Sequence, residues 1–245
     1  MTEPVRLARR LADMLGCSRR QAELYVEGGW VRVDGVVNEA PQFKVVDQTI
    51  TLDPQARAEP VLPATVLLHK PADYDWDQGA RPACSLLLPG KRWDRDRHSI
   101  TRPLQRHLQG QTCVTPLETG ASGLLVFTQD PRIRRKLTEA AAQVEHEAIV
   151  DVTGEVTEAA LRQLNRAPVV EGRAMLPAKV SISSQVDGVT GLRFAVKGSL
   201  PGQIAQMCGA VQLTVVGIRR IRVGRIALAA LPLGQWRYLM PYERI

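Results

Sequence analysis

Hydrophobic residues recur at helical spacing in two short segments near the start of the chain. In residues 5–15 the apolar positions lie three or four residues apart and arginines occupy the opposite side, as in an amphipathic helix. Gly16 can end this helix, and Ser18 can cap a second helix that continues to a glycine pair. The pattern then alternates, which predicts a hairpin over residues 30–37 and a closing strand over 49–52.

A stretch rich in proline and alanine interrupts this periodicity, and such a composition is typical of interdomain linkers. We therefore predict a small domain over residues 1–53, a linker over 54–64 and a larger domain over 65–245.

Within the larger domain, strand-like segments outnumber helical ones. One short strand ends at Lys70 and Pro71, and an apolar strand follows Gly123. Residues 131–144 show helical spacing with basic side chains outward. Further strands are predicted at residues 148–152, 178–182, 192–196, 211–216 and 225–228, and a short helix at 158–164. The fold class is therefore α+β, with a long mixed, mainly antiparallel sheet flanked by helices.

Charge adds a candidate partner, because the chain carries 32 Lys and Arg against 25 Asp and Glu, a net charge of +7. Contacts of Lys and Arg with phosphates supply most of the non-specific affinity of proteins for nucleic acid, although an excess of positive charge also serves solubility. Six basic residues fall between residues 90 and 107, which we interpret as a surface loop and short helix, with RNA contact as the second interpretation.

Composition argues against several classes of protein. The chain has no run of about 18 apolar residues and begins with charged residues, so we expect a cytoplasmic protein. Cys17, Cys84, Cys113 and Cys208 form no CxxC pair, and the four histidines have no ligand spacing. We therefore expect neither a metal site nor a disulfide framework.

One carboxylate lies in a turn of small residues directly before the apolar strand. Residues 117–130 read LETGASGLLVFTQD, and from the residues alone Glu118 would be a surface turn carboxylate. The segment resembles the signature of RsuA/RluF-type rRNA pseudouridine synthases, which reads Gly-Arg-Leu-Asp, about three variable residues, Gly-Leu-Leu and a Thr-Asn-Asp-like end. In this comparison Glu118 stands at the position of the nucleophilic Asp, and Pro116 at that of the Arg.

The N-terminal segment resembles the alpha-L RNA-binding domain of ribosomal proteins and RsuA-type synthases. The matching segments are Arg6-Leu7, the run from Gly16 to Ala22 and the run from Gly29 to Gly35. The resemblance implies an RNA-facing surface, which would be lined by Arg6, Arg9, Arg10, Arg19, Arg20 and Arg32. The alternative is that these arginines form the solvated side of an amphipathic helix pair.

The resemblance continues to the end of the chain, where Arg220-Ile221-Arg222 and the run from Leu231 to Arg237 match the RluF-like branch. Their positive charge makes Lys70, Arg220 and Arg222 further candidates for contact with RNA. The alternatives are a solvated strand end for Lys70 and, for the two arginines, the basic face of a strand whose other face is packed.

Membership of this family implies breakage of a nitrogen-glycosidic bond by one carboxylate, on a flipped uridine, without metal or cofactor. Glu118 is longer than Asp by one methylene, and a misplacement of about 1 Å can cost about 100-fold in rate. The family's stacking Tyr is replaced by Ala148, and three arginines are missing from the segment that follows Pro201.

We therefore predict a protein that binds structured, ribosomal RNA with weakened or lost catalysis. The sequence does not determine the oligomeric state, for which a monomer is favoured. The alternatives are an active synthase using Glu118 and a non-catalytic RNA-binding or ribosome-assembly factor.

Overall fold

The chain divides into two compact units, and the division does not follow the sequence order. A computed structural model describes residues 3–96, 102–167, 169–170, 173–174, 176–198 and 200–244. Unit 1 comprises Met1–Pro63 and Ser99–Gly110, and unit 2 comprises Ala64–His98 and Gln111–Ile245. The chain therefore passes between the units three times, and not only through the linker.

The described residues of unit 1 form two short α-helices and five short strands. Its elements are β1 (Val5–Arg6), α1 (Leu7–Leu15), α2 (Arg19–Glu27), β2 (Val31–Val33), β3 (Val36–Val37), β4 (Lys44–Val45) and β5 (Ile50–Leu52). The strands form one sheet in the order β3-β2-β5 and a separate pair β1-β4. One apolar cluster holds the unit together, because Leu7 and Leu11 of α1, Val26 of α2 and Val31 of β2 are all fully buried in it.

The predicted ends of the two helices are confirmed by their capping geometry. Gly16 adopts the left-handed conformation, with φ of 62°, and terminates α1. The Ser18 hydroxyl accepts a hydrogen bond from the Gln21 backbone N–H, and the Gln21 side chain accepts one from Ser18 N. This reciprocal capping box satisfies two backbone donors that the first turn of α2 would otherwise leave unpaired.

Residues 102–110 fold onto unit 1, although they were predicted as part of the domain 65–245. The Arg102 guanidinium lies 4.1 Å from the centre of the Trp30 ring. It also donates to the Gly29 carbonyl at 2.5 Å and to the Asp53 carboxylate at 2.6 Å. This long-range anchor has no signature in local periodicity, because its partners lie far away in the sequence.

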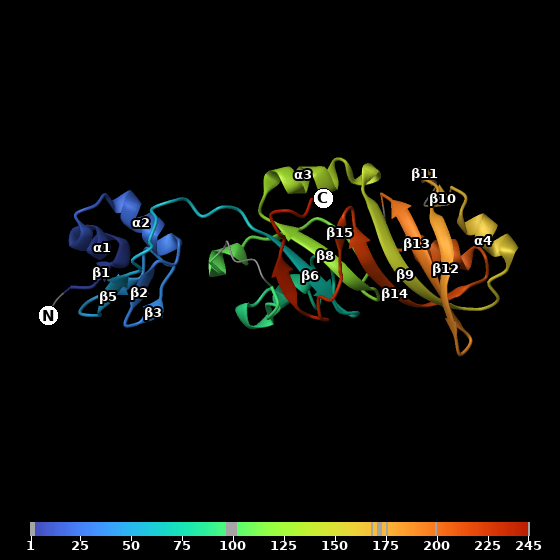
Figure 1. The fold of residues 1–245 in the computed structure, drawn as a ribbon, viewed down its shortest axis with the longest axis horizontal. Helices are drawn as coiled ribbons and strands as arrows, with labels where there is room; N and C mark the ends of the chain where they lie inside the picture. Colours follow the sequence, from blue (N-terminus) through green and yellow to red (C-terminus); the bar gives the residue numbers. More distant parts are fainter. Residues whose placement is uncertain are drawn as a thin grey trace. The chain divides into compact units, whose positions relative to one another are not determined.

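Unit 2 is built on one long sheet whose strands lie side by side in the order β12-β13-β9-β14-β8-β6-β16 (Figure 1). Its strands are β6 (Thr65–Lys70), β7 (Thr112–Cys113), β8 (Ser122–Thr128), β9 (Glu145–Thr153), β12 (Lys179–Val186), β13 (Val189–Lys197), β14 (Thr214–Val223), β15 (Ile226–Ala227) and β16 (Trp236–Tyr238). A separate short pair is formed by β10 (Val169–Val170) and β11 (Arg173–Ala174). The β14–β8 pairing is parallel and the other pairings of this sheet are antiparallel, which confirms the predicted α+β fold with a mixed, mainly antiparallel sheet.

Helices cover the sheet in two places. The described helical elements of unit 2 are α3 (Pro131–Thr138), α4 (Glu158–Leu164) and α5 (Gln203–Gly209), with 3-10 turns η1 (Ala83–Leu86), η2 (Pro89–Lys91) and η4 (Ala141–Gln143). A further 3-10 turn, η3 (Gln105–His107), belongs to unit 1. Helices α4 and α5 share an apolar cluster with β9, β12 and β13, and α3 shares another with β6, β8 and β15. Among the described residues, no helix has the length and apolar character needed to cross a membrane.

Two local predictions for unit 2 are corrected. The helix predicted over residues 131–144 ends at Thr138, and the chain continues in the 3-10 turn η4. Helix α5 was not predicted, because its seven residues are too few to establish a periodicity.

Candidate active site

The resemblance around Glu118 directs attention to one row of residues across the sheet. Lys70 pairs with Gly123, Gly123 with Arg220, and Arg220 with Ala148, in four neighbouring strands. Residues paired in this way project from the same face of a sheet. The row therefore brings two cationic side chains, one glycine and one alanine together beside the turn that contains Glu118.

Gly123 is required by the close approach of two strands. Its φ is +123°, and a Cβ at this position would lie 2.3 Å from the Arg220 carbonyl oxygen and 2.5 Å from the Arg220 backbone nitrogen. Backbone atoms cannot move out of the way as the end of a flexible side chain can. The glycine of the signature is therefore explained by packing of β8 against β14.

Arg220 is buried, and its guanidinium is bound to backbone. Its exposed fraction is 2%, and it donates to the carbonyls of Leu124 at 2.8 Å, Pro116 at 2.7 Å and Thr115 at 2.7 Å. Burial lowers the pKa of Arg220 to about 10, while the nearby Glu118 carboxylate acts in the opposite direction. Arg220 thus holds the two residues that precede Leu117 and Glu118.

Lys70 plays the matching role on the other side of Glu118. It has no exposed surface, and its Nζ donates to the carbonyls of Pro71 at 3.0 Å, Tyr74 at 2.6 Å and Thr119 at 3.1 Å. Burial lowers the pKa of Lys70 to about 8, against the attraction of Asp75 and Glu118. Lys70 therefore fixes the carbonyl of the residue that follows Glu118.

Lys70 and Arg220 were predicted to contact RNA. Both are buried in this structure, and their N–H groups are directed at backbone carbonyls. In this arrangement the two residues position the turn, and their contact with RNA stays a prediction.

Glu118 itself is half-buried, between the two anchored carbonyl groups. Its backbone carbonyl accepts a hydrogen bond from Ala121 at 3.1 Å, which closes the turn. Within the described part of the chain, its carboxylate forms no hydrogen bond or ion pair. The carboxylate is thus neither sealed in the core nor engaged by a neighbour, and two buried positive charges lie close to it.

A loop following β6 supports this turn. The Thr119 hydroxyl donates to Asp75 at 2.8 Å, and Asp73 N donates to the Thr119 carbonyl at 2.8 Å. The Arg81 guanidinium lies 4.4 Å from the centre of the Tyr74 ring. Nothing in the sequence alone linked this loop with Glu118, because the contacts join residues more than forty positions apart. No cluster of His, Cys, Asp or Glu side chains able to hold a metal ion is found in the described ranges.

Ala148, where the resemblance predicts that a stacking ring is missing, lies in apolar surroundings. It has an exposed fraction of 5% and belongs to the cluster that contains Phe194, Ile204 and Met207. By contrast, a Cβ at Gly202, where the resemblance predicts a missing arginine, would meet nothing within 4 Å.

His146 lies two residues before Ala148 in β9 and is also buried. Its Nδ1 has no hydrogen-bond partner among the described residues. Burial, together with the positive charges of Arg220 and Arg222, lowers the pKa of His146 to about 3. The imidazole is therefore neutral at physiological pH.

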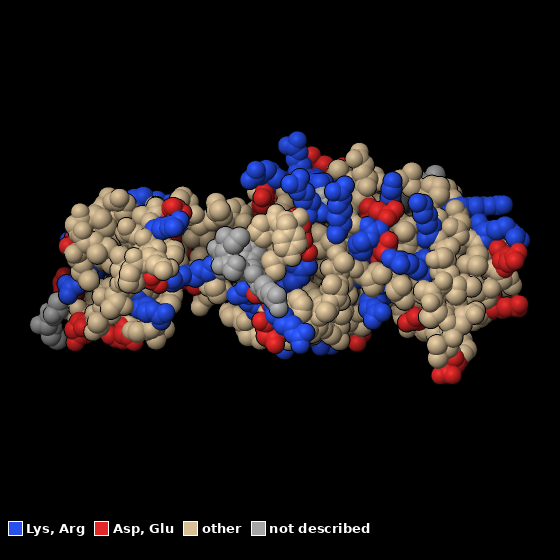
Figure 2. Space-filling view, viewed as in Figure 1, with Lys and Arg blue, Asp and Glu red and all other residues tan. Residues whose placement is uncertain are grey.

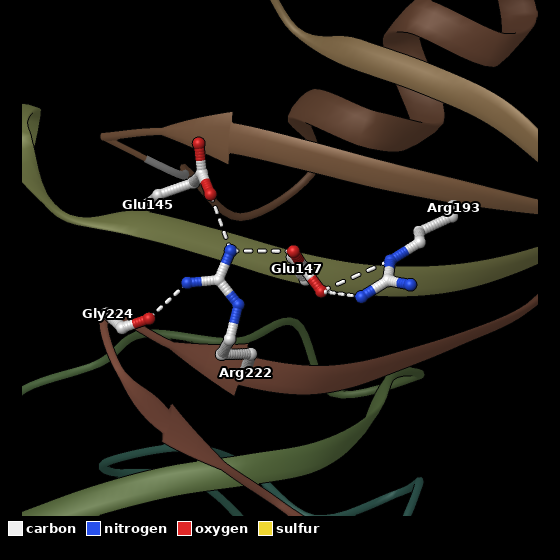
Figure 3. Close-up of polar contacts among 5 residues, drawn as sticks. All are labelled: Glu145, Glu147, Arg193, Arg222 and Gly224. Carbon is white, nitrogen blue, oxygen red and sulfur yellow. Dashed lines mark hydrogen bonds and ion pairs between the residues drawn. The ribbon is translucent and has the colours of Figure 1, made fainter.

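Arg222 faces the opposite side of the sheet from Arg220. Strand β14 has a register shift between them, so that Arg220 pairs with Ala148 and Arg222 with Glu147. Figure 3 shows the Arg222 guanidinium between Glu145, at 2.5 Å, and Glu147, at 2.7 Å. Glu147 in turn binds Arg193. The Arg222 charge is thus compensated on the sheet, which leaves less of it for the predicted contact with RNA.

The six N-terminal arginines predicted to face RNA are all exposed: Arg6, Arg9, Arg10, Arg19, Arg20 and Arg32. Only part of this set is brought together. Arg6 and Arg19 line a groove of about 660 Å³, to which residues 102–110 contribute Arg106.

Acidic residues balance the charge of this groove. Arg19 and Arg20 each lie 3.4 Å from Glu23, and Arg106 lies 2.9 Å from Glu27. Residues 1–63 contain eight Lys and Arg against nine Asp and Glu. The positive charge of the protein therefore resides mainly in unit 2.

A comparison with solved structures identifies the fold of the chain. A crystal structure of a pseudouridylate synthase superposes with a TM-score of 0.59, covering 96% of each chain at 18% identity. The architecture of the chain is thus that of a pseudouridine synthase.

Curated proteins that are similar to this chain carry the names of pseudouridine synthases. A ribosomal small subunit pseudouridine synthase A from Vibrio cholerae is 26% identical over 98% of this chain and 97% of its own length. The dual-specificity RNA pseudouridine synthase RluF of Escherichia coli strain K12 is 25% identical over 98% of this chain and 77% of its own length. No protein-family model matches the chain. Over nearly its whole length, the chain is related to the RsuA/RluF-type rRNA pseudouridine synthases.

Replacement of Gly123 by alanine tests the close approach of β8 and β14. We expect Gly123→Ala to lower the free energy of unfolding by about 3 kcal/mol, from backbone strain and overpacking together. Gly120→Ala in the same turn is the matched control, because a Cβ there meets nothing within 4 Å, and it should change stability by less than about 1 kcal/mol. Equal effects of the two substitutions in urea unfolding would contradict the role given to Gly123.

The buried neutral His146 should make the protein sensitive to acid. An unfolded histidine binds a proton near pH 6.5 whereas folded His146 binds one only near pH 3, so stability is lost as the pH falls through this range. We expect wild type to lose roughly 1.5 kcal/mol more than His146→Gln between pH 6.5 and pH 5. Parallel stability curves for the two proteins, measured by urea unfolding, would exclude a depressed pKa.

Proposed function

We propose that this protein binds structured RNA of the ribosomal type, using the body of a pseudouridine synthase, and that its isomerisation of uridine is weakened or lost. The observation that carries the proposal is the contrast within one site. The turn of Glu118 is held by Lys70 and Arg220, whereas the position of the stacking ring is occupied by Ala148.

The retained part of the site suits the first step of the family's reaction. Attack on the sugar needs an ionised carboxylate at a fixed position near the anomeric carbon. Two anchored carbonyls fix the backbone on both sides of Glu118, and the buried cations Lys70 and Arg220 lie close to it. The half-buried carboxylate has no partner within the described residues that a substrate would need to displace.

The missing part concerns the base and the RNA backbone. After the glycosidic bond breaks, the uracil must rotate while it stays in the pocket, and an aromatic ring stacked on it would restrain that motion. Ala148 offers no such surface, and Gly202 offers no positive charge. Groups of one catalytic site act as a unit, so we expect their combined loss to matter more than the longer side chain of Glu118.

The second candidate is an active synthase that uses Glu118. The freedom of its carboxylate within an otherwise anchored turn favours this candidate. Both candidates place RNA on the same protein, and they differ only in turnover.

Mapping of pseudouridine separates the two candidates. Wild type, Glu118→Ala and Glu118→Asp would be incubated with ribosomal RNA, and the product would be located by carbodiimide derivatisation and primer extension. We expect turnover at least about 100-fold below that of a working synthase in all three proteins, because Glu118→Asp restores the length of the acid but not the ring. Glu139→Ala, an exposed carboxylate on α3, controls for loss of negative charge.

Two other outcomes are informative. Product at a single uridine that disappears in Glu118→Ala would establish the active synthase and overturn loss of catalysis. Absence of both product and salt-dependent binding to ribosomal RNA would overturn the RNA-binding proposal as a whole.

A further inference from the structure

A groove of about 820 Å³ lies in unit 2 and shares no lining residue with the row around Glu118. Its walls come from the segment before residue 97, from β15 and the loop after it, and from the last residues of the chain. The lining consists of Trp93, Arg95, Arg225, Ala227, Ala229, Arg237, Met240, Tyr242, Glu243 and Arg244. Four arginines and two aromatic rings thus surround one cavity that neither the Glu118 site nor the N-terminal arginines explain.

Three of these arginines carry uncompensated charge. Arg95, Arg225 and Arg244 are exposed, and within the described ranges their side chains form no hydrogen bond or ion pair. The fourth, Arg237, is engaged by Glu243 through two contacts of 2.7 Å. The single acidic residue of the groove is therefore neutralised, and the excess of positive charge remains.

The same ion pair makes the groove rigid. Glu243 also accepts a hydrogen bond from Met240 N at 2.8 Å, so the final turn of the chain is tied to β16 through Arg237. Trp93 is also held in place. Its backbone N–H donates to the Trp236 carbonyl at 2.8 Å, and its ring packs against an apolar cluster. A preorganised surface loses less conformational entropy on binding.

Tyr242 is the unusual member of the groove. It is 79% exposed and has no ring or cation partner among the described residues. Large aromatic side chains usually bury most of their surface. An exposed ring beside unpaired arginines is the arrangement in which successive bases of a single strand stack while guanidinium groups contact the backbone.

Positive charge continues beyond the groove onto α3. Ile133 and Leu137 of α3 pack in the same apolar cluster as Ile226 and Trp93, so the helix adjoins the groove. Figure 2 shows Lys and Arg side chains gathered over α3 and β15. The exposed basic residues of α3 include Arg132, Arg134 and Arg135. A polyanion leaving the groove would therefore meet further cations.

We propose that this groove binds a single-stranded segment of RNA, with bases stacked on Tyr242 and Trp93 and phosphates contacted by Arg95, Arg225 and Arg244. The volume lies within the range of ordinary ligand pockets, but three exposed, unpaired arginines suit a chain of phosphates better than one small molecule. An acidic peptide would satisfy the arginines but would leave the exposed ring of Tyr242 without a partner. This site requires no chemistry at Glu118 and is separate from the site at which a uridine would react.

Binding of a short oligonucleotide to the full chain tests the site. The probe is fluorescein-labelled oligouridylate of about ten nucleotides, and its anisotropy is measured at several salt concentrations. We expect Tyr242→Ala to weaken binding by about 10-fold and Tyr242→Phe to retain it, because one stacked base contributes about 1–3 kcal/mol. Thermal unfolding of each variant verifies that it is folded.

A second pair of variants separates the charge of the groove from the net charge of the protein. Arg225→Gln combined with Arg244→Gln should weaken binding and reduce the slope of log affinity against log salt by about 1.4. Arg162→Gln combined with Arg166→Gln removes the same charge from α4 and the residues after it, on the other apolar cluster, and should leave the slope nearly unchanged. Equal effects of the two double variants would show that only net charge matters and would overturn the site.

Photo-crosslinking locates the probe directly. An oligonucleotide containing 5-iodouridine should crosslink to Tyr242 or Trp93, and crosslinks confined to unit 1 or to the Glu118 turn would overturn the proposal. In another outcome, polyglutamate competes with the oligonucleotide equally well while Tyr242→Ala leaves binding unchanged. That result would overturn the RNA proposal and indicate an acidic polypeptide as the ligand.

If wild type binds structured ribosomal RNA but not the oligonucleotide, the groove proposal fails alone. If it binds neither, the proposed function fails as well.

Discussion

Two buried cations hold the part of the structure on which the function depends. Removing a charged side chain from water costs free energy unless polar groups replace the lost solvation. For Lys70 and Arg220 those groups are backbone carbonyls, and three of them, on Thr115, Pro116 and Thr119, belong to residues that lie close to Glu118 on its two sides. The same hydrogen bonds therefore satisfy the two buried cations and fix the position of the turn. Gly123 completes it, because only a residue without Cβ lets β8 approach the Arg220 backbone.

The anchors of the Glu118 turn bind backbone carbonyls and not the Glu118 side chain. They therefore do not depend on which acid stands at this position. The positions at which the resemblance predicts a missing ring and missing arginines lie on β9 and at the start of α5, where Ala148 packs in an apolar cluster and a Cβ at Gly202 would meet nothing within 4 Å. The anchors of the turn and these predicted substrate contacts thus lie on different elements. Positive charge also differs between the two grooves, because Arg19 and Arg106 of the unit 1 groove are paired with glutamates. By contrast, Arg95, Arg225 and Arg244 of the unit 2 groove form no ion pair among the described residues.

Local signals in the sequence predicted the elements that depend on local physics. The capping residue Ser18, the terminating Gly16 and the alternating strands of the sheet were all identified in this way. What could not be predicted depends on contacts between distant residues. The attachment of Arg102 to Trp30 and the burial of Lys70 have no periodic signature, and charge alone favoured RNA contacts for Lys70 and Arg220. The register shift that places Arg220 and Arg222 on opposite faces of β14 is set by pairing with β9, which a simple alternation cannot reveal.

Hydrogen exchange across residues 113–123 in Arg220→Lys measures most directly whether the buried cation holds the Glu118 turn. Lysine keeps the charge but cannot present the planar fork that reaches three carbonyls at once. We expect amide exchange in this segment to rise by about 10-fold or more, since at least one charge-assisted hydrogen bond is lost. Arg219→Lys, at the exposed neighbouring position, should leave exchange unchanged. Unaltered protection of residues 113–123 in Arg220→Lys would contradict the claim that buried cations position the carboxylate.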